Sequence, residues 1–397
     1  MNETPASERI HIAIAGKRNS GKSSLLNMMT GQRLAIVSDV PGTTTDPVSK
    51  AIEINPLGPC VLIDTAGFDD DGTLGEDRVG QTRKIFGKAD AVIMVCSDTD
   101  MTQEMQWKKM ADDKGIPTVW VLGKSDAYTA DELEKMIRIM TEKTGERPVP
   151  VSALTGKGQD KLTAALQEKL GSKMQAERTI LGNMVKEGDA VLLVMPQDKQ
   201  APKGRLILPQ AQTIRELLER KCIITCCVPE SMSEAIGKLS AAPDLIITDS
   251  QVFDLVYGNK PAESRITSFS VLFARYKGDI DYFVKSAEKI KELKDGDRIL
   301  IAEACTHAPL SEDIGREKIP MMLRKKSGCR LDIDIVSGSD FPDDLSGYAL
   351  VIHCGGCMFN RQHIMNRVER ARSQGVPMTN YGITIAFLRQ ILDKIEY

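Results

Sequence analysis

Two groups of residues in this chain have types and spacings that could do chemistry, one near each end. Near the start, Gly16-Lys-Arg-Asn-Ser-Gly-Lys-Ser23 has the spacing of a phosphate-binding loop. In such a loop backbone N–H groups wrap the β-phosphate, the lysine neutralises the β and γ oxygens, and the serine hydroxyl ligates Mg²⁺. Near the other end lie Cys305-Thr-His307 and His353-Cys-Gly-Gly-Cys357, whose thiols and imidazoles are metal ligands.

Further residues complete the predicted nucleotide site. Asp64-Thr-Ala-Gly67 ends a predicted strand, where the Asp64 carboxylate can hold Mg²⁺ through water and the Gly67 amide can sense the γ-phosphate. Thr44, in Pro41-Gly-Thr-Thr-Thr-Asp46, is the expected metal-sensing hydroxyl. We therefore expect Lys22, Thr44 and Gly67 to carry the reaction, and Ser23, Thr44 and Asp64 to hold Mg²⁺.

A third element of the nucleotide site would recognise the base. Gly123-Lys-Ser-Asp126 follows a predicted strand, and Asp126 can accept hydrogen bonds from N1 and N2 of guanine. The segment Val151-Ser-Ala-Leu154 would support the same base with its backbone. The predicted nucleotide-binding residues are Gly16, Asn19, Ser20, Gly21, Lys22, Ser23, Ser24, Lys124, Asp126, Ser152 and Ala153.

The Cys/His groups each follow a predicted strand, at 298–302 and 348–352. If these strands are parallel neighbours, both groups meet at the carboxyl edge of one sheet. Structural zinc normally uses two Cys-x2-4-Cys or His-x3-5-His pairs, and only Cys354-x2-Cys357 has that form. Three thiolates, Cys305, Cys354 and Cys357, fit an iron–sulfur cluster better, with zinc and buried thiols as the alternatives.

The neighbours of these cysteines differ in their expected roles. Adjacent residues of a strand point to opposite sides, so we expect only one of His353 and Cys354 to be a ligand, and favour Cys354. Three cysteines would leave one iron with an exchangeable or histidine ligand, and Glu303 is a nearby carboxylate. The clustered Cys222, Cys226 and Cys227 are interpreted as buried core residues rather than metal ligands, as are the single residues Cys60 and Cys96.

The residues that could do chemistry need sheets to position them, and strand and helix patterns alternate along the chain. The fold class is α/β, with a doubly wound nucleotide domain at 1–172, a small α/β middle domain at 186–264 and an α/β domain at 265–397 that holds the Cys/His groups. Expected strands lie at 10–15, 60–63, 91–95, 118–122, 190–195, 222–228, 245–248, 298–302, 330–336 and 348–352, and expected helices at 131–141, 161–170, 209–220, 233–239 and 280–293.

Composition narrows the classes of function. A length of 397 residues predicts two or three domains, and a formal charge of −3 argues against a nucleic-acid partner. The sequence has neither a basic leader with an apolar core nor an apolar run of membrane-spanning length, so we expect a cytoplasmic location and no membrane partner. In that reducing compartment, clustered cysteines indicate metal before disulfide.

Over roughly the first 170 residues, the order and spacing of these motifs resemble GTPases of the Era/MnmE type. The resemblance implies guanine specificity, and Asn19 matches the branch in which such an asparagine helps to hold K⁺. The chain departs from the pattern twice. Gly123 replaces the usual asparagine of the guanine motif, which would loosen affinity or base selectivity. Phe68 stands where Ras-like enzymes have a water-orienting glutamine, so we expect slow intrinsic hydrolysis.

The joint pattern, a GTPase domain followed by C-x-H and H-C-x-x-C, resembles the maturation GTPases of [FeFe]-hydrogenase, the HydF family. The resemblance covers essentially the whole chain. It implies a homodimer formed by the middle domain and a 4Fe-4S cluster held by Cys305, Cys354 and Cys357, with His307 and His353 as further ligands or neighbours. It also implies a scaffold that receives a di-iron precursor from two radical-SAM maturases and delivers it to apo-hydrogenase.

Two other functions are compatible with parts of the sequence. One is a translation- or tRNA-associated GTPase with a structural zinc domain, although the basic RNA-binding module expected of it is absent. The other is an enzyme whose cluster performs redox chemistry. Against that interpretation, the Cys/His region has no radical-SAM Cys-x3-Cys-x2-Cys motif and no nicotinamide or flavin fingerprint.

Overall fold

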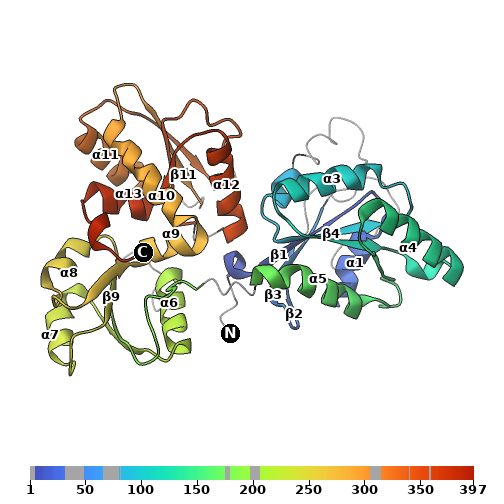
Figure 1. Cartoon of the computed structure of the whole chain (residues 1–397), viewed down its shortest axis with the longest axis horizontal. Helices are drawn as coiled ribbons and strands as arrows, with labels where there is room; N and C mark the ends of the chain where they lie inside the picture. Colours follow the sequence, from blue (N-terminus) through green and yellow to red (C-terminus); the bar gives the residue numbers. More distant parts are fainter. Residues whose placement is uncertain are drawn as a thin grey trace. The chain divides into compact units, whose positions relative to one another are not determined.

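The computed structural model describes residues 5–31, 49–65, 80, 82–174, 179–196, 206–304, 314–338, 340–356 and 359–397. The chain divides into two compact units, Met1–Glu177 and Arg178–Tyr397. Among the described residues, one sheet belongs to the first unit and two sheets belong to the second (Figure 1).

The first unit is a sheet with helices on both faces. Its elements are β1 (Ile10–Ala15), α1 (Lys22–Thr30), β2 (Ser49–Ile54), β3 (Gly58–Asp64), β4 (Ala91–Cys96), α3 (Thr102–Asp113), β5 (Thr118–Leu122), α4 (Ala130–Thr144), β6 (Val149–Pro150) and α5 (Gln159–Met174). The strand order is β2-β3-β1-β4-β5-β6, and every pair is parallel except β2 with β3.

Burial on both faces explains why the central strands are apolar runs. All six residues of β4 are buried. One face of the sheet packs against Leu25 and Leu26 of α1 and Leu162 of α5. The other face packs against Trp107 of α3 and Met140 of α4. A parallel strand that is covered on both faces does not alternate polar and apolar residues. Its apolar run was therefore enough to predict the strand.

The second unit contains two parallel sheets of four strands. Its elements are β7 (Ala190–Val194), α6 (Leu208–Glu219), β8 (Ile223–Cys227), α7 (Met232–Gly237), β9 (Leu245–Thr248), α8 (Phe253–Asn259), β10 (Arg265–Ser268), α9 (Phe269–Lys277), α10 (Ile280–Ala287), β11 (Arg298–Glu303), α11 (Ile319–Ser327), β12 (Asp332–Ser337), β13 (Leu350–His353), α12 (Arg361–Ser373), β14 (Met378–Asn380) and α13 (Tyr381–Leu388). The strand orders are β10-β9-β7-β8 and β12-β11-β13-β14.

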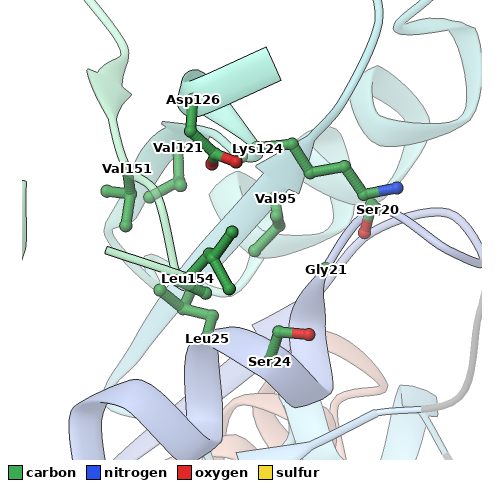
Figure 2. A pocket seen from close by; sticks show the side chains of 12 residues that line it. Ser20, Gly21, Ser24, Leu25, Val95, Val121, Lys124, Asp126, Val151 and Leu154 are labelled. Carbon is green, nitrogen blue, oxygen red and sulfur yellow. The ribbon is translucent and has the colours of Figure 1, made fainter. Parts of the chain in front are cut away.

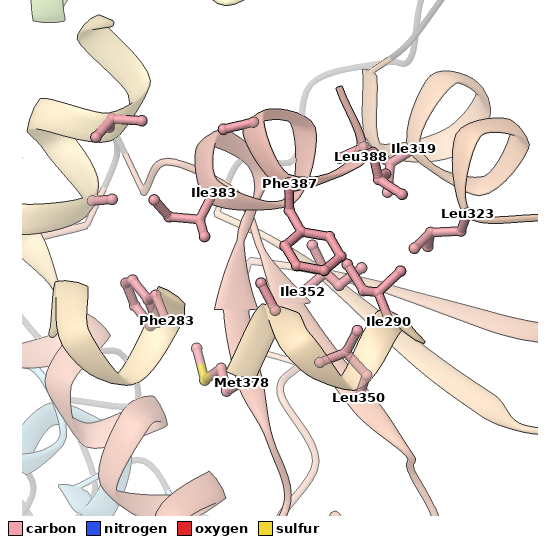
Figure 3. Packing of buried hydrophobic residues seen from close by; sticks show 14 of the residues in the cluster. Phe283, Ile290, Ile319, Leu323, Leu350, Ile352, Met378, Ile383, Phe387 and Leu388 are labelled. Atoms are coloured by element: carbon pink, nitrogen blue, oxygen red, sulfur yellow. The ribbon is translucent and has the colours of Figure 1, made fainter. Parts of the chain in front are cut away.

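A single hydrophobic core joins the two sheets of this unit. It contains Ile246 of the first sheet, Ile352 of the second and Phe283 of α10. Figure 3 shows Phe283 of α10 in this core together with Ile383 and Phe387 of α13. At the corner between α9 and α10, a Cβ added to Gly278 would lie 2.2 Å from the Phe283 ring. The close approach of these two helices therefore requires glycine.

The predicted α/β class is confirmed, with a nucleotide-binding type of sheet followed by two further α/β sheets. The domain boundaries at 1–172, 186–264 and 265–397 stay predictions. The helix expected at 280–293 differs, because α10 ends at Ala287 and a 3₁₀ helix follows over Glu288–Glu292. Among the described residues, no helix is both long and apolar enough to cross a membrane.

The interpretation of the clustered cysteines as core residues holds for some of them and is wrong for one. Cys60, Cys96 and Cys222 are buried, whereas Cys226 is exposed and Cys227 is partly buried. The reason is the strand order: β8 is an edge strand, and none of its five residues is fully buried.

The packing of α13 on α9 gives a stability prediction. A Cβ at Gly382 would lie 2.8 Å from the Ser270 side chain and 2.9 Å from its backbone carbon. We expect Gly382→Ala to lower the free energy of unfolding of the second unit by about 1–3 kcal/mol. The two tryptophans, Trp107 and Trp120, both lie in the first unit. The urea midpoint from far-UV circular dichroism should therefore fall while the midpoint from tryptophan fluorescence stays unchanged.

The control for this prediction is Gly258→Ala, because a Cβ at Gly258 of α8 meets nothing within 4 Å. That variant should unfold at the parent midpoint or slightly above it. Equal midpoints for Gly382→Ala and the parent would contradict the prediction. They would show that α9 and α13 can move apart to accept the added methyl group without a loss of stability.

Candidate functional site

The phosphate-binding loop lies between β1 and α1, as predicted. Gly16 and Gly21 have φ values of 151° and 103°, which L side chains rarely adopt. A Cβ at Gly16 would also lie 2.2 Å from the Val95 carbonyl oxygen of β4. Asn19 is in the left-handed region with φ 57°. The loop conformation therefore depends on the residue types that made it recognisable in the sequence.

Lys22 points into this loop. It is 7% exposed, and its Nζ donates hydrogen bonds to the carbonyl oxygens of Gly16 and Lys17 at 3.0 and 2.7 Å. The loop thus surrounds a buried ammonium group with backbone. That arrangement is suited to phosphate oxygens, which would bring the opposite charge.

Ser23 and Asp64, predicted to hold Mg²⁺, are in direct contact. The Ser23 hydroxyl donates to Asp64 Oδ2 at 2.6 Å. Asp64 is buried, and its other oxygen, Oδ1, makes no hydrogen bond among the described residues. Burial raises the pKa of Asp64, against the opposing effects of the Ser23 hydrogen bond and the Lys22 charge. A buried carboxylate oxygen without a partner beside a serine hydroxyl fits a hydrated Mg²⁺ ion.

The base-recognition segments also converge. A cavity is lined by Ser20, Gly21, Ser24, Leu25, Val95, Val121, Gly123, Lys124, Asp126, Val151, Ala153 and Leu154. In Figure 2 the Asp126 carboxylate and the Val95 and Leu154 side chains lie around this cavity. A hydrogen bond with the Ser152 side chain lowers the pKa of Asp126, so its carboxylate stays ionised as an acceptor for a base.

Gly123, where the guanine motif departs from its usual form, has a geometric consequence. A Cβ at this position would lie 2.8 Å from the Ser20 carbonyl oxygen and 3.2 Å from Val95 Cγ1. The phosphate-binding loop therefore packs directly on the backbone at Gly123. Thr44, Gly67 and Phe68 lie outside the described residues, and the roles predicted for them, and for Asn19 with K⁺, stay predictions.

The predicted metal site lies at the carboxyl edge of the last sheet, where β11 and β13 are parallel neighbours. Ala302 pairs with His353, and Cys354 N donates to Ala302 O at 2.9 Å. Just past the ends of the two strands, the Ala304 N–H donates to the Cys354 sulfur at 2.9 Å. The chain segments that carry the two Cys/His groups therefore meet at Ala304 and Cys354. Cys305, His307 and Cys357 lie outside the described residues.

His353 is held by protein groups on both ring nitrogens. Its exposed fraction is 1%, its Nε2 lies 2.9 Å from Arg367 Nη1, and its Nδ1 lies 2.6 Å from the Cys354 carbonyl oxygen. Because arginine can only donate, Nε2 is the acceptor and Nδ1 carries the proton. Burial, and then the neighbouring Arg367 cation, lower the pKa of His353 to about 3. The imidazole is therefore neutral.

Other charged groups line the same edge. Arg367 stacks between the rings of Phe341 and Phe359, each 4.7 Å from the guanidinium carbon. Glu303 accepts hydrogen bonds at Oε2 from Arg316 at 3.0 Å and Ser337 at 3.1 Å. The ion pair with Arg316 restrains the carboxylate that the sequence placed near an open metal position. Within the described residues, no group of three or more His, Cys, Asp or Glu could hold a metal ion.

Sequence reasoning missed two buried cations here. Lys277 at the end of α9 donates from Nζ to the carbonyl oxygens of Gly356 and Phe359, and Arg367 of α12 contacts His353. Lys277 ends the largely apolar helix α9 and Arg367 lies in the polar helix α12, and nothing in their spacing points to the Cys/His groups. Only the fold brings them together.

Three family models match parts of this chain. Residues 180–278 match the hydrogen maturase F dimerization domain, and residues 281–396 match the hydrogen maturase F tetramerization domain. These two matches cover more than half of the chain. The chain belongs to the HydF family. Residues 11–124 match the 50S ribosome-binding GTPase model, so this HydF-family chain begins with a P-loop GTPase domain.

These matches confirm the predicted family and show that the HydF-family chain carries oligomerization domains. The region predicted to bind an iron–sulfur cluster is described by its family model as a tetramerization domain, and cluster binding stays a prediction. The alternative of a translation-type GTPase with a zinc domain is not favoured, because HydF domains fill the part of the chain where that appendage was expected.

Individual relatives resemble the GTPase part. The tRNA modification GTPase MnmE of Natranaerobius thermophilus is 35% identical over 186 residues, 44% of this chain and 38% of the relative. GTPase Der of Desulforudis audaxviator is 29% identical over 217 residues, 52% of this chain and 49% of the relative. The chain thus matches less than half the length of either relative. Era from Aquifex aeolicus bound to GDP.AlF4- has a TM-score of 0.37 at 19% identity, over 58% of this chain and 98% of that chain.

Because Asp64 is buried, we expect its replacement by asparagine to stabilise the nucleotide-free protein and to weaken GTP binding. Because its pKa is raised in the folded state, ionised Asp64 opposes folding at pH 7, above the ordinary pKa of aspartate. We expect Asp64→Asn to raise the urea midpoint from tryptophan fluorescence in nucleotide-free protein at pH 7, and the gain to shrink as the pH falls toward that ordinary value. Mg²⁺-dependent GTP binding should weaken by about 10–100-fold.

The matched control is Asp113→Asn, which removes an exposed carboxylate of α3. It should change neither the midpoint nor the binding. If Asp64→Asn were less stable than the parent at pH 7, the carboxylate would be stabilised by its contacts rather than penalised by burial.

Proposed function

We propose that this chain is a GTP-binding and GTP-hydrolysing scaffold or carrier that assembles or delivers the di-iron precursor of the [FeFe]-hydrogenase active site. One observation carries the proposal: a P-loop GTPase domain, in which Ser23 is hydrogen-bonded to Asp64, lies in the same chain as two hydrogen maturase F domains. The partners on this proposal are two radical-SAM maturases and apo-hydrogenase, and the location is the cytoplasm.

We further propose that Cys305, Cys354 and Cys357 hold a 4Fe-4S cluster. What supports this is the chemistry around Cys354. Its sulfur accepts the Ala304 N–H at the point where the chain enters Cys305, and the Arg367 cation lies close enough to interact with it electrostatically. N–H donors and nearby cations favour a thiolate, the form that binds iron. A cluster bound there would supply an iron with a coordination position open to exchange.

The contacts of His353 support a positioning role for it on this proposal. Its Nε2 accepts from Arg367 and its Nδ1 donates to the Cys354 carbonyl, so both nitrogens are engaged without a metal. The imidazole then fixes the backbone at Cys354 and leaves metal binding to the thiols. His307 lies outside the described residues, and its part as a ligand or neighbour remains a proposal.

In the GTPase domain, Lys22 would neutralise the phosphates and Ser23, Thr44 and Asp64 would hold Mg²⁺. The chain has Phe68 in place of a water-orienting glutamine, so hydrolysis without a partner would be slow, with K⁺ near Asn19 as an aid. GTP binding or hydrolysis would change the conformation of the segments that carry Thr44 and Gly67. That change would in turn favour or disfavour partner docking or cluster delivery. The middle domain would form the homodimer, in line with its dimerization match.

Removal of the phosphate-loop lysine tests the role of GTP. We expect Lys22→Ala to lower the rate of GTP hydrolysis by about 10²–10³-fold, because the charge opposite the γ-phosphate is lost. Hydrogenase activity after maturation of apo-hydrogenase in vitro should fall with it. Lys135→Ala, an exposed lysine of α4, serves as the control. If Lys22→Ala supported maturation as well as the parent, the proposed role of GTP in maturation would be contradicted.

Reconstitution tests the metal site. After anaerobic reconstitution with iron and sulfide, we expect a cubane-type EPR signal in the reduced parent and its loss in the Cys305/Cys354/Cys357 triple-alanine variant. Cys226→Ala, which removes an exposed thiol of β8, should keep the signal. Bound zinc without an iron signal in the parent would contradict the cluster and with it the maturation role.

A further inference from the structure

A buried lysine contacts the loop that carries Cys357. Lys277 is the last residue of α9 and is 3% exposed. Its Nζ donates to the carbonyl oxygens of Gly356 at 3.1 Å and Phe359 at 3.0 Å, one on each side of the Cys357 segment. The Phe359 N–H also donates to the Gly356 carbonyl, at 3.0 Å, which closes the turn. A single side chain therefore bridges the two ends of this turn.

The position of Lys277 is fixed by contacts in both directions. Arg361, at the start of α12, donates to the carbonyl oxygens of Tyr276 and Gly278 at 2.9 and 2.7 Å. The residues on either side of Lys277 are thus bound by the segment that follows the turn. Gly278 in turn packs under the Phe283 ring. The backbone on both sides of Lys277 is therefore held.

The contact also joins two family domains. Lys277 lies in the dimerization match, 180–278, and Gly356 and Phe359 lie in the tetramerization match, 281–396. A helix of the dimerization match therefore holds a turn that belongs to the tetramerization match.

The positive charge of Lys277 has an effect beyond holding the turn. Carbonyl oxygens can accept the N–H groups of an ammonium ion, but they carry only partial negative charge. Arg367 places another cation on the same loop, 2.9 Å from His353. Lys277 contacts the turn, and Arg367 contacts His353 and stacks on the Phe359 ring. These two buried positive groups near the segment from His353 to Phe359 provide the electrostatic environment that an anionic group there would need.

We propose that Lys277 is a positioning residue for the predicted metal-binding loop: it holds Gly356 and Phe359, the residues that flank Cys357 and Met358 in the sequence, and would place a positive charge beside a cluster bound there. This rests on the proposed cluster at Cys305, Cys354 and Cys357. An added electron makes a thiolate-bound cluster more negative, so a nearby fixed cation favours the reduced form and raises the reduction potential.

The test compares three variants of the full chain. Lys277→Met removes the charge and the donors at similar length, Lys277→Arg keeps the charge, and Lys285→Met removes the charge of an exposed lysine on the neighbouring α10. For each reconstituted protein, the midpoint potential is measured by EPR-monitored redox titration, and the rate of cluster loss is measured with an iron chelator. Amide hydrogen exchange at residues 354–360 is measured in the metal-free proteins.

For Lys277→Met we expect the equilibrium constant for cluster reduction to fall by about tenfold, a midpoint lower by about 59 mV for one electron. Cluster loss should accelerate several-fold, and exchange at Phe359 should accelerate in the metal-free protein because the turn is no longer held. Lys277→Arg should recover most of the potential, and Lys285→Met should match the parent. If Lys277→Met does not fold, Lys277→Gln carries the same expectation for the potential.

Two results would overturn the inference. One is a parent-like potential together with a parent-like rate of cluster loss in Lys277→Met. The other is unchanged exchange at Phe359, which would show that the turn does not depend on the lysine. A parent protein that binds no cluster would instead contradict the proposed function. In that case the exchange measurement still decides whether Lys277 holds the turn.

Discussion

Both sites depend on parallel strand pairing. Ile14 of β1 pairs with Asp64 of β3, and the Ser23 hydroxyl then reaches a carboxylate 41 residues away. Ala302 of β11 pairs with His353 of β13, and the Ala304 N–H reaches a sulfur 50 residues away. Strands of a parallel sheet point in one direction, so the residues that follow them gather at a single edge. A change of register in either pair would separate the groups that could do chemistry.

The dependence of both sites on parallel strands explains which parts of the fold could be predicted from the sequence. Strands buried on both faces, such as β4, are apolar runs, and the motifs that follow such runs are therefore predictable at a sheet edge from residue types alone. Strand β2 was missed because it alternates between exposed and half-buried residues at an edge, and β14 because it has only three residues. Cys226 was misjudged because an apolar sequence does not reveal which strand is last in a sheet.

Contacts made by single side chains across the fold were beyond prediction for a different reason. Lys277 and the carbonyl of Gly356 are 79 residues apart, and neither belongs to a spacing pattern. Arg367 reaches His353 from a helix whose sequence is typical of a charged surface helix, although the arginine is buried. Sequence patterns report periodicity and local chemistry. The direction of one long side chain depends on how helices pack, which those patterns do not encode.

On our proposals, the two kinds of contact at the metal-binding edge would have different functions. The pairing of β11 with β13 fixes Ala302 against His353 through the backbone, and it does not depend on Lys277. The turn between Gly356 and Phe359 depends on one side chain from α9, which belongs to the dimerization match. Loss of the Lys277 contacts would loosen the turn and leave the strands paired.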